Sequence, residues 1–433
     1  MRYLIFTLHY IAQIIKPFIR LLPYPLQTLV RNIYHKLVQV SRVSTSTTFD
    51  IEVQNKRYAK QSDILSFPKK PKGSVAYATN RLINAQKNEL FIGGGERYCL
   101  ALSNLLLQLG FKVTVFQMSS KEFEINYNGL PIVGLRYGKN FAEFHYEFSN
   151  NFYHESLRYD HVIYNLPEIA SGKVRPDALL ICHGIWFDHD LHGPIVRTKL
   201  WFEHLYNALS QPQKIVSVDM NSINVVRALW PKLAEKMIFL PNFVDTDQFS
   251  PPKVRENKTP IVIIPRRAAI LRGSRIMEEI LSHLTEDCHI YWIGKGDYSE
   301  NVVLEKLEQN DARFKFFHAD FEEIAHFYRL ADIVVIPSIA AEGTSLSALE
   351  AMASGCAVVA THVGGLTNLI IHGFNGLLVE PSGEKIAKAI SYLITNPQKR
   401  AEMQRHARMI AEFFSKQIWE DRWKHVLKEL RWL

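Results

Sequence analysis

The chain has 433 residues, of which 47% are hydrophobic and 22% are charged, with a formal net charge of +8. That length exceeds one ordinary hydrophobic core, and the composition excludes a disordered or fibrous chain, so we expect two folded domains plus extensions. The four cysteines are scattered without a CxxC pair, which argues against a zinc site or a disulfide framework and favours a reducing compartment.

The positive charge is concentrated at the start of the chain. Residues 1–49 contain six Lys or Arg and no Asp or Glu, which leaves a net charge of only +2 for the rest. A nucleic-acid groove would need its positive charge on the folded body, so we expect no nucleic-acid partner.

Residues 1–50 are predicted to form a basic amphipathic helical segment. Arg2, His9, Gln13, Lys16 and Arg20 share one stripe at helical spacing, and apolar residues surround it. The charges at 16 and 20 argue against a transmembrane span, and no small-residue cleavage site follows. We expect the segment to lie on an anionic membrane surface, which makes the protein peripheral on the cytoplasmic face; packing on the protein's own body is the alternative.

Beyond this segment, apolar strand patterns alternate with helical ones, which is typical of parallel α/β sheets. The predicted strands are 74–78, 112–116, 161–164, 178–182, 214–218, 261–264, 289–293, 314–317, 333–336 and 357–360. The fold class is therefore α/β, with two doubly wound Rossmann-like domains facing a cleft. We place the first domain at 51–241, a linker at 242–260, the second domain at 261–410 and, at 411–433, a C-terminal helix that packs back across the cleft.

The second domain contains a pattern suited to binding phosphate. A buried strand ends at Pro337, a short loop carries Glu342, and a helix is predicted to begin near Thr344 or Ser345, either of which is a good N-cap. Free backbone N–H groups at such a helix start bind anions. Glu342 and Glu350 flank this seat, and carboxylates accept hydrogen bonds from sugar hydroxyls, so a diphosphate with a sugar on each side would fit.

The run from Glu342 through Glu350, Gly355–Ala360 and Gly364–Gly365 to Gly373–Val379 resembles the donor domain of family-four glycosyltransferases. This family is of the glycosyl transferases group 1 type and has the GT-B fold. The resemblance implies that Glu342 contacts hydroxyls of the transferred sugar, that Glu350 contacts the ribose of the nucleotide, and that the amides of Ser345 and Leu346 hold the diphosphate.

Other motifs extend the resemblance upstream. Residues 241–249 are similar to the family's linker motif, although Phe243 stands where the family usually has glycine. Arg267 and Arg272 occupy the spacing of the family's Arg and Lys-Gly pair, and two cations in one loop would neutralise a departing diphosphate.

The first domain carries weaker signals. Gly93 and Gly94 resemble the family's glycine-rich loop, which lets the backbone approach the donor phosphate, and His183 occupies the place of a histidine beside the reacting sugar. The triplet Asp188–Asp190 has the DxD pattern of a metal site in another glycosyltransferase fold, but it lies in the acceptor-side domain. We interpret it as a surface loop and expect neither an essential metal nor a cofactor.

The chain is therefore predicted to be a retaining glycosyltransferase, and the sugar that it transfers is expected to be a hexose. A nucleotide-diphosphate sugar is the co-substrate, and the acceptor is a glycan or a lipid-linked glycan at the membrane. The sequence leaves open a sugar-nucleotide epimerase or hydrolase on the same fold, and also a non-catalytic sugar-nucleotide-binding subunit.

Overall fold

The computed structural model describes residues 72–91, 93–137, 144–185, 199–255, 257–319 and 321–433. The chain divides into two units, Met1–Leu65 and Ser66–Leu433, and all the described residues belong to the second. The predicted amphipathic segment 1–50 and the triplet Asp188–Asp190 lie outside the described residues. Among the helices that are described, none combines the length and the hydropathy needed to cross a membrane.

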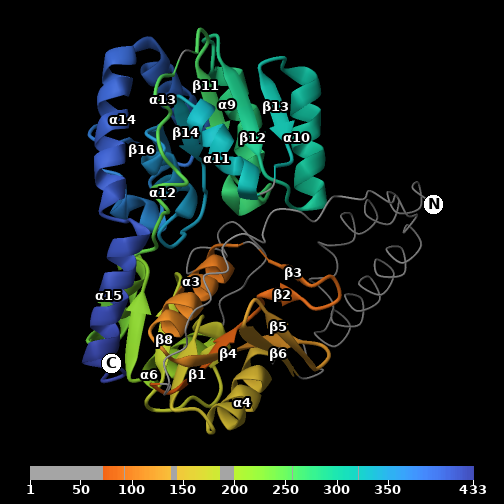
Figure 1. The fold of residues 1–433 in the computed structure, drawn as a ribbon. Helices are drawn as coiled ribbons and strands as arrows, with labels where there is room; N and C mark the ends of the chain where they lie inside the picture. Colours follow the sequence, from red (N-terminus) through yellow and green to blue (C-terminus); the bar gives the residue numbers. More distant parts are fainter. Residues whose placement is uncertain (1–71, 92, 138–143, 186–198, 256, 320) are drawn as a thin grey trace, which may run out of the picture. The chain divides into compact units, whose positions relative to one another are not determined.

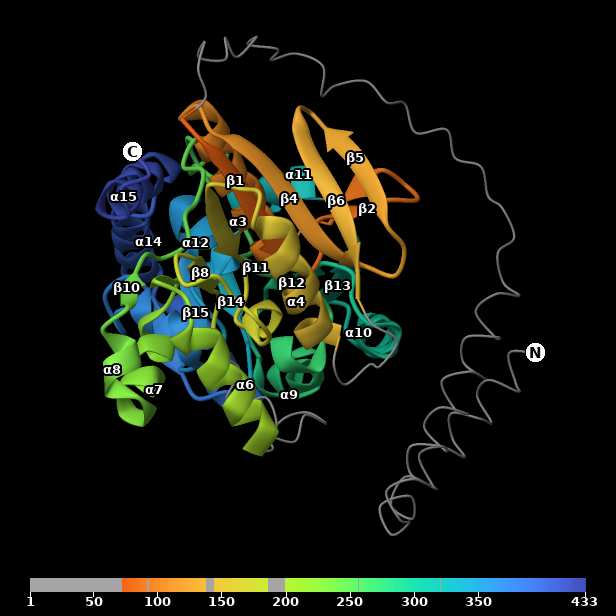
Figure 2. The same ribbon diagram turned by 90° about the horizontal axis from the view of Figure 1, so that it is seen from below.

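The first half of the described chain builds an eight-stranded sheet in the order β10-β9-β8-β7-β1-β4-β6-β5 (Figures 1 and 2). Every pairing is parallel except that of the edge strand β5 with β6. The strands are β1 Ser74–Thr79, β4 Lys112–Ser119, β5 Phe123–Tyr127, β6 Leu130–Arg136, β7 His161–Tyr164, β8 Leu179–Cys182, β9 Lys214–Ser217 and β10 Met237–Phe239. A separate two-stranded ribbon pairs β2 Ile83–Asn84 with β3 Glu89–Leu90.

Helices cover this first sheet because its central strands are apolar on both faces. In β1 and β8 nearly every residue is buried, so each face needs a helical layer. The helices are α3 Gly94–Gln108, α4 Phe144–Ser156, α6 Lys199–Ser210, α7 Met220–Leu229 and α8 Pro231–Ala234. α3 buries Leu102, Leu105 and Leu106, which recur at helical spacing.

The second half builds a six-stranded, fully parallel sheet in the order β13-β12-β11-β14-β15-β16. The strands are β11 Ile261–Ile264, β12 His289–Ile293, β13 Phe314–Phe317, β14 Ile333–Ile336, β15 Ala357–Thr361 and β16 Leu377–Val379. Numbered within the sheet, this is the order 3-2-1-4-5-6 of a Rossmann fold, in which the strand order reverses between β11 and β14. Ligands of such sheets bind at that switch point, beyond the carboxyl ends of the strands.

The helices of the second half are α9 Met277–His283, α10 Tyr298–Asn310, α11 Phe321–Leu330, α12 Leu346–Ala353, α13 Gly383–Thr395 and α14 Pro397–Glu412. The interdomain segment 242–260 is packed at its start, where Val244 and Phe249 are fully buried in the core of the second sheet, whereas Val254 is exposed. The chain therefore belongs to the second core almost as soon as it leaves the first.

The last helix, α15 Lys416–Glu429, returns to the first sheet (Figure 1). Trp419 and Trp423 are buried in the same hydrophobic core as β1 and α3. The chain passes between the two domains twice, near Val244 and again near Ser415, and backbone hydrogen bonds join these two segments. The Val244 amide donates to the Phe414 carbonyl at 2.9 Å, and the Lys416 amide donates to the Val244 carbonyl at 3.0 Å. The first core is thus built from two separate stretches of sequence.

The predicted fold class is confirmed. All ten predicted strands are present, most of them within one residue of the predicted ends. The helix predicted near Thr344 or Ser345 begins at Leu346, with Ser345 as its N-cap. The strands β5, β6, β10 and β16 and the β2–β3 ribbon were not predicted from the sequence.

Candidate functional site

A cleft of about 630 Å³ is lined by residues from both sheets. Its first-domain wall includes Asn80, Asn165 and His183, which directly follow β1, β7 and β8. Its second-domain wall includes the loops after β11 and β14. Both walls therefore lie at the carboxyl ends of strands next to a switch point, where doubly wound sheets bind ligands.

The phosphate seat predicted from the sequence is the start of α12. Ser345 has an extended backbone and its hydroxyl accepts a hydrogen bond from the Ala348 amide at 3.4 Å, which caps the helix. Ser345 and Leu346 both line the cleft. The amides of the first helical turn are not used inside the helix, so they can donate to an anion.

Glu342 is held by two arginines at the mouth of this seat. Arg266 and Arg272 donate to Glu342 Oε2 at 2.8 and 2.7 Å, and the Ser338 hydroxyl donates to Glu342 Oε1 at 2.8 Å. Only 7% of the Glu342 side chain is exposed, and only 8% of Arg266. Two cations and one carboxylate leave this buried group with a net positive charge, which suits a diphosphate.

The surroundings of Glu342 and Arg272 decide their protonation states. Burial alone would raise the pKa of Glu342, but the charges of Arg266 and Arg272 and the hydrogen bonds to the carboxylate outweigh it and hold the pKa below its usual value. Burial lowers the pKa of Arg272 to about 10, and the charge of Glu342 opposes this effect. At neutral pH, Glu342 and Arg272 are therefore both charged.

Glycines allow the Glu342 loop to fit between the two domains. A Cβ atom on Gly343 would lie 2.3 Å from the His183 carbonyl oxygen, and one on Gly365 would lie 2.5 Å from the Gly343 carbonyl oxygen. Gly364 has φ +48° and its Cβ would lie 2.5 Å from the Glu342 amide nitrogen. The backbone of Gly364 and Gly365 therefore packs directly against the backbone of the Glu342 loop.

The first domain contributes the start of α3. Gly93 is the N-cap of this helix, and Gly94 lies against α12, because a Cβ on it would be 3.5 Å from Leu346 Cδ1. Glu96, in the first turn, pairs with Arg81 at 2.7 Å. The start of α3 and the start of α12 therefore border the same cleft from opposite domains.

His183 lies at the end of β8, buried and facing the cleft. Its Nε2 is 3.2 Å from Asn165 Oδ1, and its ring meets that of Tyr98 edge-to-face with centroids 4.8 Å apart. Burial lowers the pKa of His183 to about 4. The imidazole is therefore neutral at pH 7, and with its proton on Nε2 it donates to the Asn165 carbonyl oxygen.

Glu350, the second predicted carboxylate, does not line the cleft. It is 4% exposed, and its two oxygens accept from Arg97 Nη1 at 2.7 Å and from the Tyr328 hydroxyl at 2.9 Å. Arg97 belongs to the first domain and does line the cleft. The ion pair of Arg97 with Glu350 therefore links α3 to α12 across the domains.

The structure brings eight of the nine predicted site residues to one cleft: Glu342, His183, Arg267, Arg272, Ser345, Leu346, Gly93 and Gly94. Arg267 is exposed at its edge and, among the described residues, takes no part in the Glu342 network. Arg266 and Arg97 were not predicted from the sequence. Arg266 directly precedes Arg267, and the two differ in burial: Arg266 is buried after β11, whereas Arg267 is exposed. The signal for Arg97 was its position as the first basic residue after the glycine-rich loop.

A metal site has no support from side-chain clustering: in the described part of the chain, no three His, Cys, Asp or Glu side chains gather closely enough to hold a metal ion. The prediction that the reaction needs no metal stays a prediction.

Residues 245–409 match the family model of glycosyl transferases group 1. The chain is similar to a D-inositol 3-phosphate glycosyltransferase of Pseudarthrobacter chlorophenolicus, with 33% identity over 165 residues, which is 37% of each chain. A protein of the same name from Xylanimonas cellulosilytica is 29% identical over 202 residues, which is 42% of this chain and 48% of the relative. The chain thus matches less than half the length of these curated relatives.

Solved structures resemble this chain over most of its length. Sucrose-phosphate synthase of Thermosynechococcus elongatus superposes with a TM-score of 0.70 at 18% identity, covering 82% of this chain and 98% of the other. HepE of Anabaena, in complex with UDP and glucose, gives a TM-score of 0.64 at 16% identity, covering 82% and 100%. These likenesses establish the GT-B fold and do not extend to substrates.

Proposed function

We propose that this chain, whose residues 245–409 match the glycosyl transferases group 1 family, is a retaining hexosyltransferase. It transfers a sugar from a nucleotide-diphosphate sugar to a glycan or a lipid-linked glycan at the membrane surface. The observation that carries this proposal is the buried Glu342 with its two arginines at the start of α12, inside a cleft between two switch points.

The donor is assigned to the second-domain wall. The diphosphate would accept from the amides of Ser345 and Leu346 and lie near Arg272 and Arg266. A sugar bound in front of the seat could donate one hydroxyl to the remaining acceptor capacity of Glu342 Oε1. HepE is similar to this chain in fold and was solved with UDP-glucose, so a UDP-sugar is the first donor to test.

Retention would follow from substitution on the front face of the sugar. Double displacement needs a carboxylate nucleophile beside the anomeric carbon. Glu342 is the carboxylate beside the seat, and it is anchored by three donors, which makes it a poor nucleophile. We propose instead that the departing diphosphate accepts the proton of the acceptor hydroxyl while the arginines and the helix start stabilise its charge.

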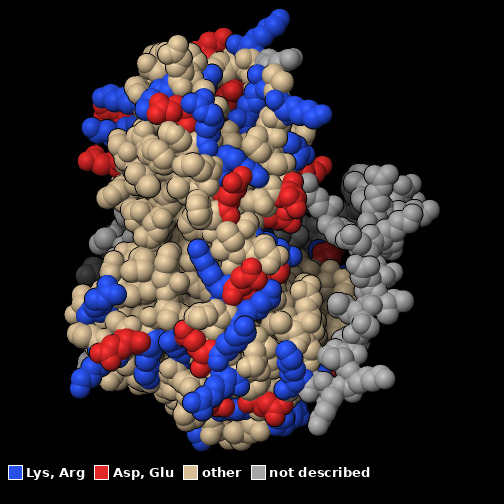
Figure 3. All heavy atoms as spheres, turned by 60° about the vertical axis from the view of Figure 1, so that its left-hand side comes forward, with Lys and Arg blue, Asp and Glu red and all other residues tan. Residues whose placement is uncertain are grey.

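The membrane part of the proposal rests on the sequence of residues 1–50, whose basic stripe fits an anionic surface. The face of the folded body in Figure 3 differs, because its basic and acidic side chains are interspersed over both domains. We assign the proposed attraction to anionic lipid to residues 1–50, which hold six Lys or Arg and no Asp or Glu before residue 50.

Thermal-shift measurements of the full chain with UDP-, GDP-, ADP- and TDP-glucose test donor binding first. One nucleotide should raise Tm in a concentration-dependent way, because ligand binding to the native state stabilises it. The anomeric configuration of the product, read by NMR from that donor, should match the donor's. An inverted product would refute the front-face mechanism.

Variants test the assignment and its alternatives. Glu342→Ala and Arg272→Ala should each abolish transfer while the circular dichroism spectrum stays native. Full transfer activity in either variant would refute the site. An epimerase or hydrolase would turn over donor equally with and without a glycan acceptor, whereas a non-catalytic subunit would bind donor and never release nucleotide.

A further inference from the structure

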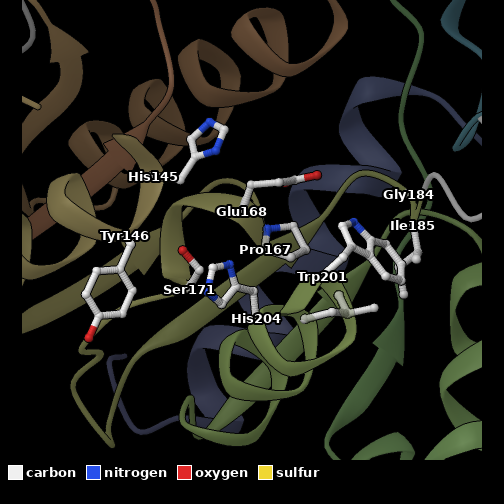
Figure 4. A pocket seen from close by; sticks show the side chains of 10 residues that line it. His145, Tyr146, Pro167, Glu168, Ser171, Gly184, Ile185, Trp201 and His204 are labelled. Carbon is white, nitrogen blue, oxygen red and sulfur yellow. The ribbon is translucent and has the colours of Figure 1, made fainter. Parts of the chain in front are cut away.

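A second, smaller cavity of about 140 Å³ lies in the first domain (Figure 4). Its walls come from the segments after β7 and β8 and from the helices α4 and α6. The lining includes the side chains of Pro167, Glu168, Ser171, Ile185, Trp201 and His204.

Two chain segments contribute lining residues both to the larger cleft and to this cavity. After β7, Asn165 and Leu166 line the cleft, and the next two residues, Pro167 and Glu168, line the cavity. After β8, His183 lines the cleft and Gly184 and Ile185 line the cavity. In each of these two segments, consecutive residues line first the cleft and then the cavity. In the segment after β8, His183 is the last residue that lines the cleft.

Gly184 makes this change of direction possible. Its φ of +137° is a conformation that favours glycine, so the chain can turn directly after His183. The Ile185 amide then donates to the Ser222 hydroxyl at 3.0 Å, which fixes the wall of the cavity.

Two polar side chains of the cavity have unused hydrogen-bonding capacity. Glu168 Oε2 and Ser171 Oγ are both buried and have no hydrogen-bond partner among the described residues. Ser171 is only 5% exposed, so water does not compensate its hydroxyl through the surface. A buried polar atom without a partner costs about 1–3 kcal/mol, which a ligand hydroxyl would recover.

The rest of the lining is mostly apolar or aromatic. It includes Pro167, Ile185 and Trp201 together with His145 and His204, and among the described lining residues there is no Lys or Arg. A cavity of about 150 Å³ accommodates a benzene ring, so the volume here suits one six-membered ring. Sugar and cyclitol rings combine an apolar C–H surface with hydroxyl groups, which matches an aromatic wall facing a carboxyl group.

We propose that this cavity is the acceptor subsite and that it selects an unphosphorylated, hydroxylated six-membered ring, which is hydrogen-bonded by Glu168 and Ser171. The inference rests on the proposed function, because it places the acceptor beside the donor cleft. It separates this chain from the relatives named for D-inositol 3-phosphate. A phosphate group would meet the Glu168 carboxyl in a space whose described walls supply no lysine or arginine.

The test measures acceptor binding apart from donor chemistry. Saturation-transfer NMR on the full chain, saturated with the nucleoside diphosphate found by thermal shift, uses three probes: methyl α-glucoside, methyl α-glucosaminide and glucose 6-phosphate. We expect one of the two unphosphorylated probes to bind at least tenfold more tightly than the phosphorylated probe. In Glu168→Gln and in Ser171→Ala this affinity should fall at least fivefold, with nucleotide affinity unchanged.

Glu155→Gln is the matched control, because Glu155 lies on α4 outside the cavity and pairs with Arg158. It should leave probe binding unchanged. Tighter binding of glucose 6-phosphate, no binding of any probe, or equal binding in Glu168→Gln would each overturn the inference. A chain that binds no nucleotide would instead refute the proposed function.

Discussion

Arg266 and Arg267 are neighbours in sequence and differ in their surroundings. Arg266 is 8% exposed and donates to Glu342, Ser338 and Ser345, whereas Arg267 is exposed at the edge of the cleft. Sequence spacing alone favoured Arg267. The buried position of Arg266 makes it the cation on which the charge state of Glu342 depends most.

Replacing Arg266 should therefore be much more harmful than replacing Arg267. Arg266→Ala leaves a buried carboxylate with one cation, and we expect a loss of about 3 kcal/mol in the free energy of unfolding and at least 100-fold in donor turnover. Arg267→Ala should change stability by less than about 0.5 kcal/mol. Urea unfolding measures the stability of both variants, and release of nucleotide from the donor measures their turnover. Equal losses in the two variants would contradict the conclusion that Glu342 depends on Arg266 more than on Arg267.

The buried His183 gives a prediction on pH. Its pKa is about 4 in the folded chain and about 6.5 when unfolded, so between these values the unfolded state binds more protons. Its contribution to folding is therefore neutral above pH 6.5 and becomes unfavourable as the pH falls toward 4. On this basis His183 should cost about 2 kcal/mol on going from pH 7 to pH 5.

His183→Gln keeps a hydrogen-bonding side chain but does not titrate in this range. Its free energy of unfolding should fall by about 2 kcal/mol less than that of the parent chain between pH 7 and pH 5. Glu342 also loses its favourable contribution on acidification, in both proteins alike, so the comparison isolates His183. Identical pH profiles of urea unfolding would show that His183 is not buried in its neutral form.

At the scale of elements, the loop from β14 to α12 is positioned by the backbone of its neighbours. Gly343 lies against the end of β8, and Gly364 and Gly365 lie against its other side. The Thr344 hydroxyl donates to the Val218 carbonyl, and the Asn242 side chain donates to the Thr344 carbonyl at 2.6 Å. The loop that carries Glu342 is thus fixed by both domains at once.

Gly343→Ala should disturb this element without touching any polar side chain. The new Cβ would require a shift of backbone, because the His183 carbonyl oxygen lies 2.3 Å away. We expect at least a tenfold loss of donor turnover with an unchanged nucleotide preference. Gly95→Ala is the control, since Gly95 is helical, lines the same cleft and has 3.8 Å to its nearest neighbour; equal effects would contradict a specific role for the close approach at Gly343.

The sequence predicted some elements well and others poorly, for physical reasons. Strands such as β14 and β15 are buried on both faces, so their uninterrupted apolar runs are visible in the sequence. The edge strands β5 and β16 alternate or are short, and β10 has three residues, so their patterns resemble loops. The order of the strands in each sheet depends on contacts between residues far apart in sequence, so no local pattern encodes it.

The same limit applies to the candidate site. Glu342 and the Ser345 cap were found from the local pattern of a strand, a short loop and a helix start, whereas Arg272 was found from the resemblance to the family's Arg and Lys-Gly pair. The pairing of Arg97 with Glu350 joins residues 253 positions apart. Only the packing of the two sheets could reveal it, and it makes Arg97 a candidate competitor for the carboxylate predicted to bind ribose.

At the scale of the whole molecule, α15 stabilises the first domain. Trp423 is fully buried, and its indole N–H donates to the Tyr98 hydroxyl at 3.1 Å; Tyr98 in turn packs against His183. Tyr98 therefore connects the helix to the site, because its ring contacts Trp419, Trp423 and His183.

Trp423→Ala should remove about 3–5 kcal/mol from the free energy of unfolding, through the lost burial and the cavity left behind. Guanidinium unfolding followed by circular dichroism measures this. Lys424→Ala, one residue along the same helix, has a partly exposed ion pair with Asp421 and should cost less than about 1 kcal/mol. Equal losses would contradict the packing of α15 on the first core.

Residues 1–50 give the prediction on membranes. The full chain should float with vesicles of phosphatidylcholine and phosphatidylglycerol, and only weakly with phosphatidylcholine alone. Lys16→Gln combined with Arg20→Gln removes two charges, each worth about 1 kcal/mol near an anionic surface, so affinity should fall about 30-fold. Unchanged binding of this double variant would mean that the basic stripe does not contact lipid.

The return of α15 to the first sheet has a consequence for how the protein is made. The core around β1 and α3 includes Trp419, Trp423 and Trp432, which are synthesised after the entire second sheet. From Leu240 to Trp432 the ribosome adds 192 residues, which takes about 10 to 40 s at ordinary translation rates. During that interval the apolar residues that α15 covers in the finished protein lack their partner, so this is the stage of synthesis at which the chain is most prone to aggregate.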